Sequence, residues 1–210
     1  MAIIRKSPVL SEDTSALYTS GMEVAKLFVG LGNPGQKYAS NRHNAGFMCL
    51  DRMVEMYETP WQDKRDFKSH FAQIEIGGIR LIMLKPQTYV NLSGEAVLKV
   101  AQFYKLIPEN IHVIYDEVRL PFGTIEVLAG QQTFGHNGLK SIAGLIEGEM
   151  KLIRFGIGPK RPEQIALTDF VLADFTAEEA VKLPGLTREV CSIIGEASGG
   201  DLPNGRRSVA

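Results

Sequence analysis

The sequence of 210 residues has only two cysteines, almost no net charge and no long hydrophobic run. Cys49 and Cys191 lie far apart, each among apolar residues, so we expect buried free thiols in a reducing compartment and no disulfide framework. No stretch approaches the roughly 18 apolar residues of a membrane span, and the N-terminus lacks the hydrophobic region of a secretory signal. These absences predict a cytoplasmic protein without a membrane segment.

A strong positive field is also missing, because the net charge is -1 in a chain with 44% hydrophobic and 22% charged residues. Any nucleic-acid site must therefore be a local patch. Length and composition are typical of one soluble domain that mixes helices and strands. We expect this domain over residues 25–197, a flexible leader over 1–24 in which Met22 is an alternative start, and a flexible tail over 198–210.

Signatures of several enzyme classes are absent as well. No HxxxH or HxH spacing, which would favour a metal site, occurs among the four histidines His43, His70, His112 and His136. No G-x-S-x-G elbow presents a nucleophilic serine, and Ser93 is explained as a helix cap. The turn at residues 32–35 is an alternative phosphate cradle, yet it lacks G-x-G-x-x-G spacing and Pro34 removes a backbone donor. We therefore expect neither a metal nor a cofactor.

Apolar periodicity predicts an alternation of strands and helices. The expected strands are 26–31, 71–76, 79–84, 111–115, 123–128 and 152–157, with a tight turn at residues 77–78, and the expected helices begin near residues 47, 93, 139 and 176. Thr176 and Glu179 form a capping box for the last helix, which Pro184 should kink or split.

The most informative stretch is Lys26–Cys49, where a short buried strand is followed by glycines and then by polar side chains. His43 lies in this polar segment, and Asp116 follows the strand 111–115, at the edge where open α/β sheets bind ligands. An imidazole can take a proton from water near neutral pH if a carboxylate fixes its tautomer. Asparagine amides such as that of Asn33 suit a carbonyl or its oxyanion. The residues alone favour a hydrolase that activates water, with satisfied polar loop residues as the alternative.

Longer motifs carry more specific information. They are V-G-L-G-N-P-G-x-x-Y and R-H-N-A-G-F within 29–47, K-P-Q-T-Y-V-N-L-S-G at 85–94, Y-D-E-V-R-L-P-F-G at 115–123, G-H-N-G-L-K-S-I at 135–142 and R-F-G-I-G at 154–158. With these motifs the chain resembles the bacterial-type peptidyl-tRNA hydrolase family. The resemblance implies a single-domain three-layer α/β sandwich with a twisted mixed sheet between helices, and a monomer without an obligate protein partner. It also implies hydrolysis of the ester that joins a peptide to the 3′-terminal ribose of tRNA in peptidyl-tRNA, which recycles tRNA from aborted translation.

The resemblance further implies roles for individual residues. His43 matches the general base, Asp116 the carboxylate that keeps this imidazole basic, and Asn33 the position that senses an acylated α-nitrogen. The positions that hold the peptidyl group and the tRNA 3′ end are matched by Tyr38, Tyr89, Asn91 and Asn137.

The chain departs from the family pattern where tRNA phosphates are expected to bind. Arg119 stands where the family has an acid, Glu126 and Leu128 replace basic residues, and the loop 129–135 replaces a glycine-rich one. Each lost phosphate contact should weaken tRNA binding and reduce its salt dependence. A smaller tRNA phosphate patch would remain, made of Lys140, Lys151 and Arg154. Two alternatives follow: a non-catalytic RNA-binding relative, and a hydrolase of small N-acyl amino acid esters.

Overall fold

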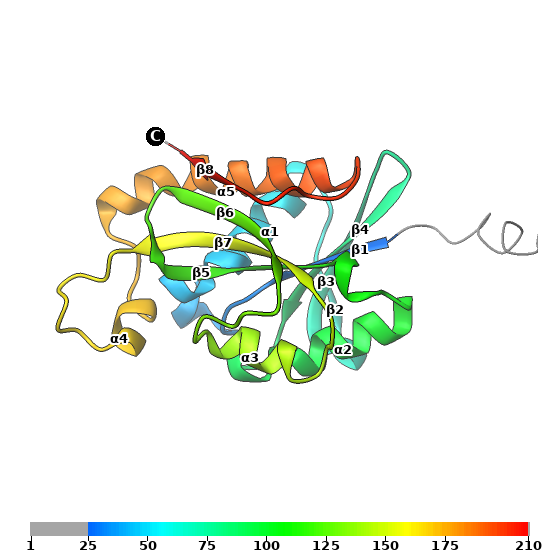
Figure 1. Ribbon diagram of the computed structural model, residues 1–210, viewed down its shortest axis with the longest axis horizontal. Coiled ribbons are helices and arrows are strands. Elements are labelled where there is room, and N and C mark those ends of the chain that lie inside the picture. Colours follow the sequence, from blue (N-terminus) through cyan, green and yellow to red (C-terminus); the bar gives the residue numbers. More distant parts are fainter. Residues whose placement is uncertain (1–24, 210) are drawn as a thin grey trace, which may run out of the picture.

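The computed structural model describes residues 25–209 (Figure 1), so the expectation of a flexible leader lies outside the described residues. The strands are β1 Ala25–Gly30, β2 Gln62–Lys64, β3 Ser69–Ile76, β4 Ile79–Pro86, β5 Ile111–Pro121, β6 Thr124–Gly130, β7 Met150–Gly158 and β8 Gly205–Ser208. The helices are α1 Ala45–Met56, α2 Ser93–Tyr104, α3 Asn137–Ala143, α4 Leu167–Val171 and α5 Ala177–Ala197. Short 3-10 turns are Gln36–Tyr38, Arg42–Asn44, Arg65–Phe67, Val90–Leu92 and Pro108–Asn110.

All eight strands form one mixed sheet in the order β2-β3-β4-β1-β5-β7-β6-β8. The central strands β4, β1, β5 and β7 pair in parallel, and the outer strands are added antiparallel. Helices α1 and α5 cover one face of the sheet and α2 and α3 the other (Figure 1), each pair over its own apolar core. Because the central strands are buried on both faces, most of their residues are apolar. The expected three-layer α/β sandwich is confirmed.

Gly46 allows helix α1 to begin against the middle of the sheet. A Cβ atom on Gly46 would lie 2.4 Å from the carbonyl oxygen of Ile114 on β5 and 2.5 Å from the amide nitrogen of Leu31, just after β1. Any larger residue would push the helix start away from these two strands. This close approach brings His43, three residues before Gly46, next to Asp116, two residues beyond Ile114.

Several helix details differ from the sequence-based expectations. The capping box of Thr176 and Glu179 is confirmed, but α5 continues without a break through Pro184. Pro184 and Ala180 lie on exposed surface, where water can satisfy the carbonyl that has lost its N–H partner. The assignment of Ser93 as a helix cap was wrong, because Ser93 is the first residue of α2 and its buried hydroxyl donates a 2.9 Å hydrogen bond to the Val90 carbonyl.

Part of the C-terminal tail that was expected to be flexible forms a strand. Gly205–Ser208 form strand β8, which pairs antiparallel with β6 and lies along the edge of the sheet (Figure 1). The sequence of this strand is polar and lacks the apolar alternation from which a strand can be predicted. Ion pairs fasten it instead: Arg206 contacts Glu126 at 2.6 Å, and Arg207 contacts Glu189 at 2.9 Å and Glu196 at 2.6 Å.

Two expectations from composition can be compared with the structure. Cys49 and Cys191 are both free and buried, as expected. Within residues 25–209, no helix combines the length and the apolar character that crossing a membrane would require.

Candidate active site

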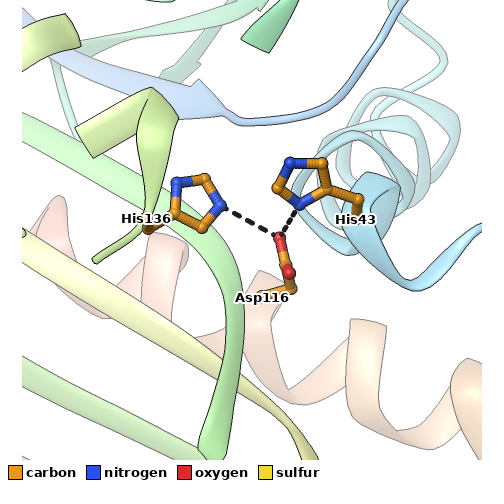
Figure 2. Close-up of side chains that lie close together, drawn as sticks. All are labelled: His43, Asp116 and His136. Carbon is orange, nitrogen blue, oxygen red and sulfur yellow. Dashed lines mark hydrogen bonds and ion pairs between the residues drawn. The ribbon is translucent and has the colours of Figure 1, made fainter. Parts of the chain in front are cut away.

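Three side chains from distant parts of the sequence meet at the end of the central strands (Figure 2). His43 comes from the 3-10 turn before α1, Asp116 from β5, and His136 from the residue that precedes α3. One oxygen of Asp116, Oδ1, lies 2.8 Å from Nδ1 of His43 and 3.1 Å from Nε2 of His136. The three side chains are 12%, 3% and 8% exposed, respectively, so bulk water screens these contacts little.

The start of helix α3 fixes the tautomer of His136. Its Nδ1 atom accepts hydrogen bonds from the backbone N–H groups of Gly138, at 3.1 Å, and Leu139, at 3.4 Å. A nitrogen that accepts carries no proton, so the remaining proton of this neutral imidazole is on Nε2 and is donated to Asp116. His136 therefore holds the carboxylate in place without cancelling its charge.

Asp116 in turn fixes the tautomer of His43. Because the carboxylate is an acceptor, Nδ1 of His43 must carry the proton of this contact. The lone pair of neutral His43 is then on Nε2, to which no described residue bonds. This atom is the one available to take a proton from water.

The electrostatics of the cluster agree with this arrangement. Burial disfavours the Asp116 carboxylate, but the two neighbouring imidazoles and their hydrogen bonds hold its pKa well below the usual value. Burial also acts to lower the pKa of His43, whereas the charge and the hydrogen bond of Asp116 outweigh that effect and raise it. An ionised carboxylate beside a more basic imidazole is the arrangement that general-base catalysis needs.

Asn33 presents a hydrogen-bond donor to the same site. Its Oδ1 atom accepts the backbone N–H of Val90 at 3.0 Å, which leaves the Nδ2 group without a partner among the described residues. The backbone of Asn33 is fixed as well, since it exchanges two 2.9 Å hydrogen bonds with the side chain of Asn44. The amide is thus held with its N–H groups available to a ligand carbonyl.

A cleft of about 500 Å³ opens over this cluster. It brings together most of the predicted site residues, namely Asn33, His43, Tyr89, Asn91, Asp116 and Asn137. Helix α4 and the residue after it add apolar side chains to the lining, namely Leu167, Val171 and Leu172. Tyr38 does not line this cleft; it lies on the Gln36–Tyr38 turn, where the Lys37 ammonium is 4.7 Å from its ring.

The residues of the predicted tRNA phosphate patch differ in how available their charges are. Arg154 is only 7% exposed and pairs with Glu117 at 2.8 Å and with Glu126, so its charge is neutralised inside the protein. Lys151 donates to the carbonyl of Leu202 at 2.8 Å. Lys140, on α3, is exposed and stays a candidate phosphate contact. The sequence did not reveal the two acid partners of Arg154, and they leave its charge less available to a phosphate than that of Lys140.

Three cleft residues were missed as site residues by the sequence analysis. His136 was considered only as a metal ligand, although it lies in the same G-H-N-G-L-K-S-I motif as Asn137. Arg119 and Phe134 were noted only as departures from the family pattern, and both line the cleft.

The three clustered side chains also form a set that can hold a metal ion, because their ligand atoms lie within 4.8 Å of one another. In the observed arrangement, both nitrogen atoms that face Asp116 carry protons, and Nδ1 of His136 is occupied by the start of α3. A metal at this point would have to replace both protons. The hydrogen-bonded cluster as it stands suits proton transfer.

Comparison with known proteins agrees with this geometry. The family model described as peptidyl-tRNA hydrolase matches residues 27–204. The chain is 43% identical over 162 residues to a peptidyl-tRNA hydrolase of Gloeobacter violaceus, which covers 77% of this chain and 81% of that protein. It is 42% identical over 178 residues to one of Dinoroseobacter shibae, with 84% and 74% covered. The solved structure of peptidyl-tRNA hydrolase from Acinetobacter baumannii superposes with a TM-score of 0.79 at 31% identity, over 85% of this chain and 91% of that one. The chain therefore belongs to the peptidyl-tRNA hydrolase family.

Proposed function

We propose that this protein hydrolyses the ester between the peptide and the 3′-terminal ribose of peptidyl-tRNA, with His43 as general base and no metal or cofactor. The observation that carries the proposal is the open Nε2 atom of His43, whose tautomer Asp116 fixes at the floor of the cleft. The product is free tRNA, so the reaction recycles tRNA from aborted translation.

The proposed reaction begins with a water molecule between His43 and the ester carbonyl. Nε2 of His43 takes a proton from this water, and the resulting imidazolium is stabilised by the negative charge of Asp116. The hydroxide attacks the carbonyl carbon to give a tetrahedral intermediate. When the intermediate collapses, the ester C–O bond breaks and the imidazolium returns the proton to the ribose oxygen. The peptide leaves as a carboxylic acid.

Asn33 is proposed to select substrates whose α-nitrogen is acylated. Its open Nδ2 group is a donor, and the carbonyl of an N-acylated residue is an acceptor that matches it. The α-ammonium of ordinary aminoacyl-tRNA is itself a donor and cannot accept this hydrogen bond. Leaving the Asn33 donor desolvated and unpaired would disfavour that substrate. Productive aminoacyl-tRNA would thus be spared.

Four further residues are proposed to bind the peptidyl group and the tRNA 3′ end. Asn91 and Asn137 are exposed in the cleft and offer both donors and acceptors, and the ring of Tyr89, 58% exposed, can stack on a base. Tyr38 keeps its proposed role as a contact outside the cleft. The protein is proposed to act as a monomer, and its substrate supports a cytoplasmic location.

The test is a turnover assay with three substrates: N-acetyl-aminoacyl-tRNA, the same aminoacyl-tRNA without the acetyl group, and a small N-acyl amino acid ester. We expect hydrolysis of the first only, unchanged by a chelator. Hydrolysis of the small ester alone would favour a small-ester hydrolase, and RNA retention without turnover would favour a non-catalytic RNA-binding protein. Either result would overturn the proposal.

The matched variants are His43→Ala and His70→Ala. The first should lower kcat by roughly 10²- to 10⁴-fold, the usual contribution of a general base, while tRNA binding is retained. His70 lies on β3 and does not line the cleft, so its variant should keep the wild-type rate. Near-normal turnover by His43→Ala would remove His43 from the mechanism.

A further inference from the structure

Arg119 is an unpaired cation at the cleft. It lies on β5, its side chain is exposed, and it lines the cleft that contains His43. Among residues 25–209, no carboxylate forms an ion pair with it. By contrast, the guanidinium groups of Arg42, Arg154 and Arg207 each face a carboxylate.

The backbone directs Arg119 toward the cleft. The pairing of β5 with β7 loses its regular register between Glu117 and Pro121, and Arg119 lies within this irregularity. Such irregularities turn a side chain away from the direction that regular pairing would give it. The distortion is fixed by Glu117, whose Oε1 atom accepts the backbone N–H of Arg119 at 2.9 Å while its Oε2 atom pairs with Arg154.

Phe134 holds the guanidinium of Arg119 in position. The centre of its ring is 5.7 Å from the Arg119 guanidinium carbon and 4.3 Å from that of Arg154. Phe134 adopts a φ of 49°, a left-handed conformation that is unfavourable for a bulky residue. The contacts of the ring with the two arginines offset the cost of this backbone conformation. Buried Arg154 thus anchors the ring, and the ring supports Arg119.

We propose that Arg119 binds the phosphodiester on the 5′ side of the 3′-terminal nucleotide of tRNA, with Phe134 as the ring that positions it. This inference rests on the proposed function, because that phosphodiester is the charged group of the substrate nearest to the ester. A planar guanidinium matches two phosphate oxygens, and one that is already held on a ring loses less freedom when it binds. The cation that replaces an acid at this position thus offsets part of the positive charge missing from β6.

The test measures Kd over a series of salt concentrations for tRNA and for the same tRNA trimmed of its three 3′-terminal nucleotides. For intact tRNA, Arg119→Gln should weaken binding about tenfold, the usual scale for a charged hydrogen bond. It should also reduce the slope of log Kd against log salt by about 0.7 to 1, the value for one phosphate contact. For trimmed tRNA, the variant and the wild type should bind equally.

Two further variants, at Arg119 and at Phe134, and one control variant away from the cleft test the details of this contact. Arg119→Lys should keep the salt slope but lose part of the affinity, because the charge stays while the planar contact with Phe134 is lost. Phe134→Leu should weaken binding of intact tRNA less than Arg119→Gln does. Arg188→Gln, at an exposed arginine on α5 away from the cleft, should leave both quantities unchanged.

Two outcomes would overturn the inference: an unchanged Kd and slope for Arg119→Gln with intact tRNA, or an equal loss with intact and trimmed tRNA. The measurement needs no turnover, so it is independent of the hydrolysis assay. A protein that hydrolyses N-acetyl-aminoacyl-tRNA but fails this binding test would keep its proposed function and lose the role of Arg119.

Discussion

His112 lies near the start of strand β5, and His43 contacts Asp116 farther along that strand. Both imidazoles are largely shielded from water, yet their pKa values move in opposite directions. His112 is 1% exposed, stacks on the ring of Phe28 at 4.5 Å and has no acid beside it within residues 25–209. Burial, assisted by the positive charge of Lys26, lowers its pKa to about 4. Partial burial acts in the same direction on His43, whose side chain is 12% exposed, but Asp116 outweighs this effect and raises the pKa.

Burial thus lowers the pKa of a histidine, and an acid partner beside the ring raises it again. In the core, the ring of His112 packs against Phe28 as an apolar side chain would. The cleft uses the ring of His43 as a base, because the cation formed during the reaction has a carboxylate to stabilise it.

Asp116→Asn should make the environment of His43 resemble that of His112. Without the carboxylate, only burial acts on the pKa of His43, so this pKa should fall. The wild-type rate requires neutral His43, so kcat/KM should decline as pH falls through the raised pKa, and in the variant this decline should move to lower pH. We expect kcat to drop by about 10³-fold at neutral pH, because the imidazolium loses its counter-charge. A pH profile of N-acetyl-aminoacyl-tRNA hydrolysis measures both effects.

The control for this variant is Asp169→Asn, at an exposed aspartate on α4, which should reproduce the wild-type profile. If Asp116→Asn lowered kcat but left the pH limb in place, Asp116 would orient His43 without setting its basicity. An unchanged kcat would remove the carboxylate from the mechanism.

Arg154→Met tests how much the buried ion pair with Glu117, the next carboxylate on β5, contributes to stability. The Glu117 side chain is 3% exposed and its Oε2 atom is 2.8 Å from Arg154. Removing the guanidinium leaves a buried charge without its partner, so we expect the free energy of unfolding to fall by about 3 to 5 kcal/mol. Denaturant unfolding measures the loss. The double variant Glu117→Gln/Arg154→Met should recover part of it, and a loss below about 1 kcal/mol in the single variant would show that the pair is dispensable.

His112→Phe tests the core side of the comparison through the pH dependence of stability. The unfolded chain takes up a proton at His112 near its ordinary pKa of 6.5, whereas the folded protein does so only near 4. Between these values the unfolded state binds more protons, so stability is lost as pH falls from 6.5 to 4, by about 3 kcal/mol in total. His112→Phe keeps a ring against Phe28 and should remove this slope. Parallel pH curves for the two proteins would contradict the assignment.

Much of the fold could be predicted because its elements carry local signals. The apolar alternation on either side of residues 77–78 predicts the β3–β4 hairpin, and the positive φ of Gly77 and Gly78 explains why glycines occupy that turn. The capping box of Thr176 marks the start of α5. Strand β8 has no such signal, because its arginines pair with acids on other elements, β6 and α5, and no pattern within the strand reveals these partners.

The candidate site was predictable to a different degree for different residues. His43, Asp116 and Asn33 lie in motifs, and the structure brings them to one cleft. The contribution of His136 depends on which of its ring nitrogens caps α3, a geometric fact that no spacing rule contains. Arg119 and Arg154 were interpreted by charge alone, whereas their environments separate them: one is exposed without an acid, and the other is buried between two.

Arg206→Ala extends the comparison to a charge pair at the protein surface. Arg206 pairs with Glu126 at 2.6 Å, but its side chain is 59% exposed, so water already solvates the guanidinium. We expect the free energy of unfolding to fall by less than about 1 kcal/mol, and the difference from wild type to vanish near 1 M salt, where the Debye length is about 3 Å. Thermal unfolding at low and high salt measures this. Glu126 keeps buried Arg154 as a partner in the variant, so no unpaired charge remains inside. A loss of stability as large as that of Arg154→Met would mean that the pairing of β8 stabilises the edge of the sheet. The exposed fraction of a charged side chain would then not predict how much stability its removal costs in this protein.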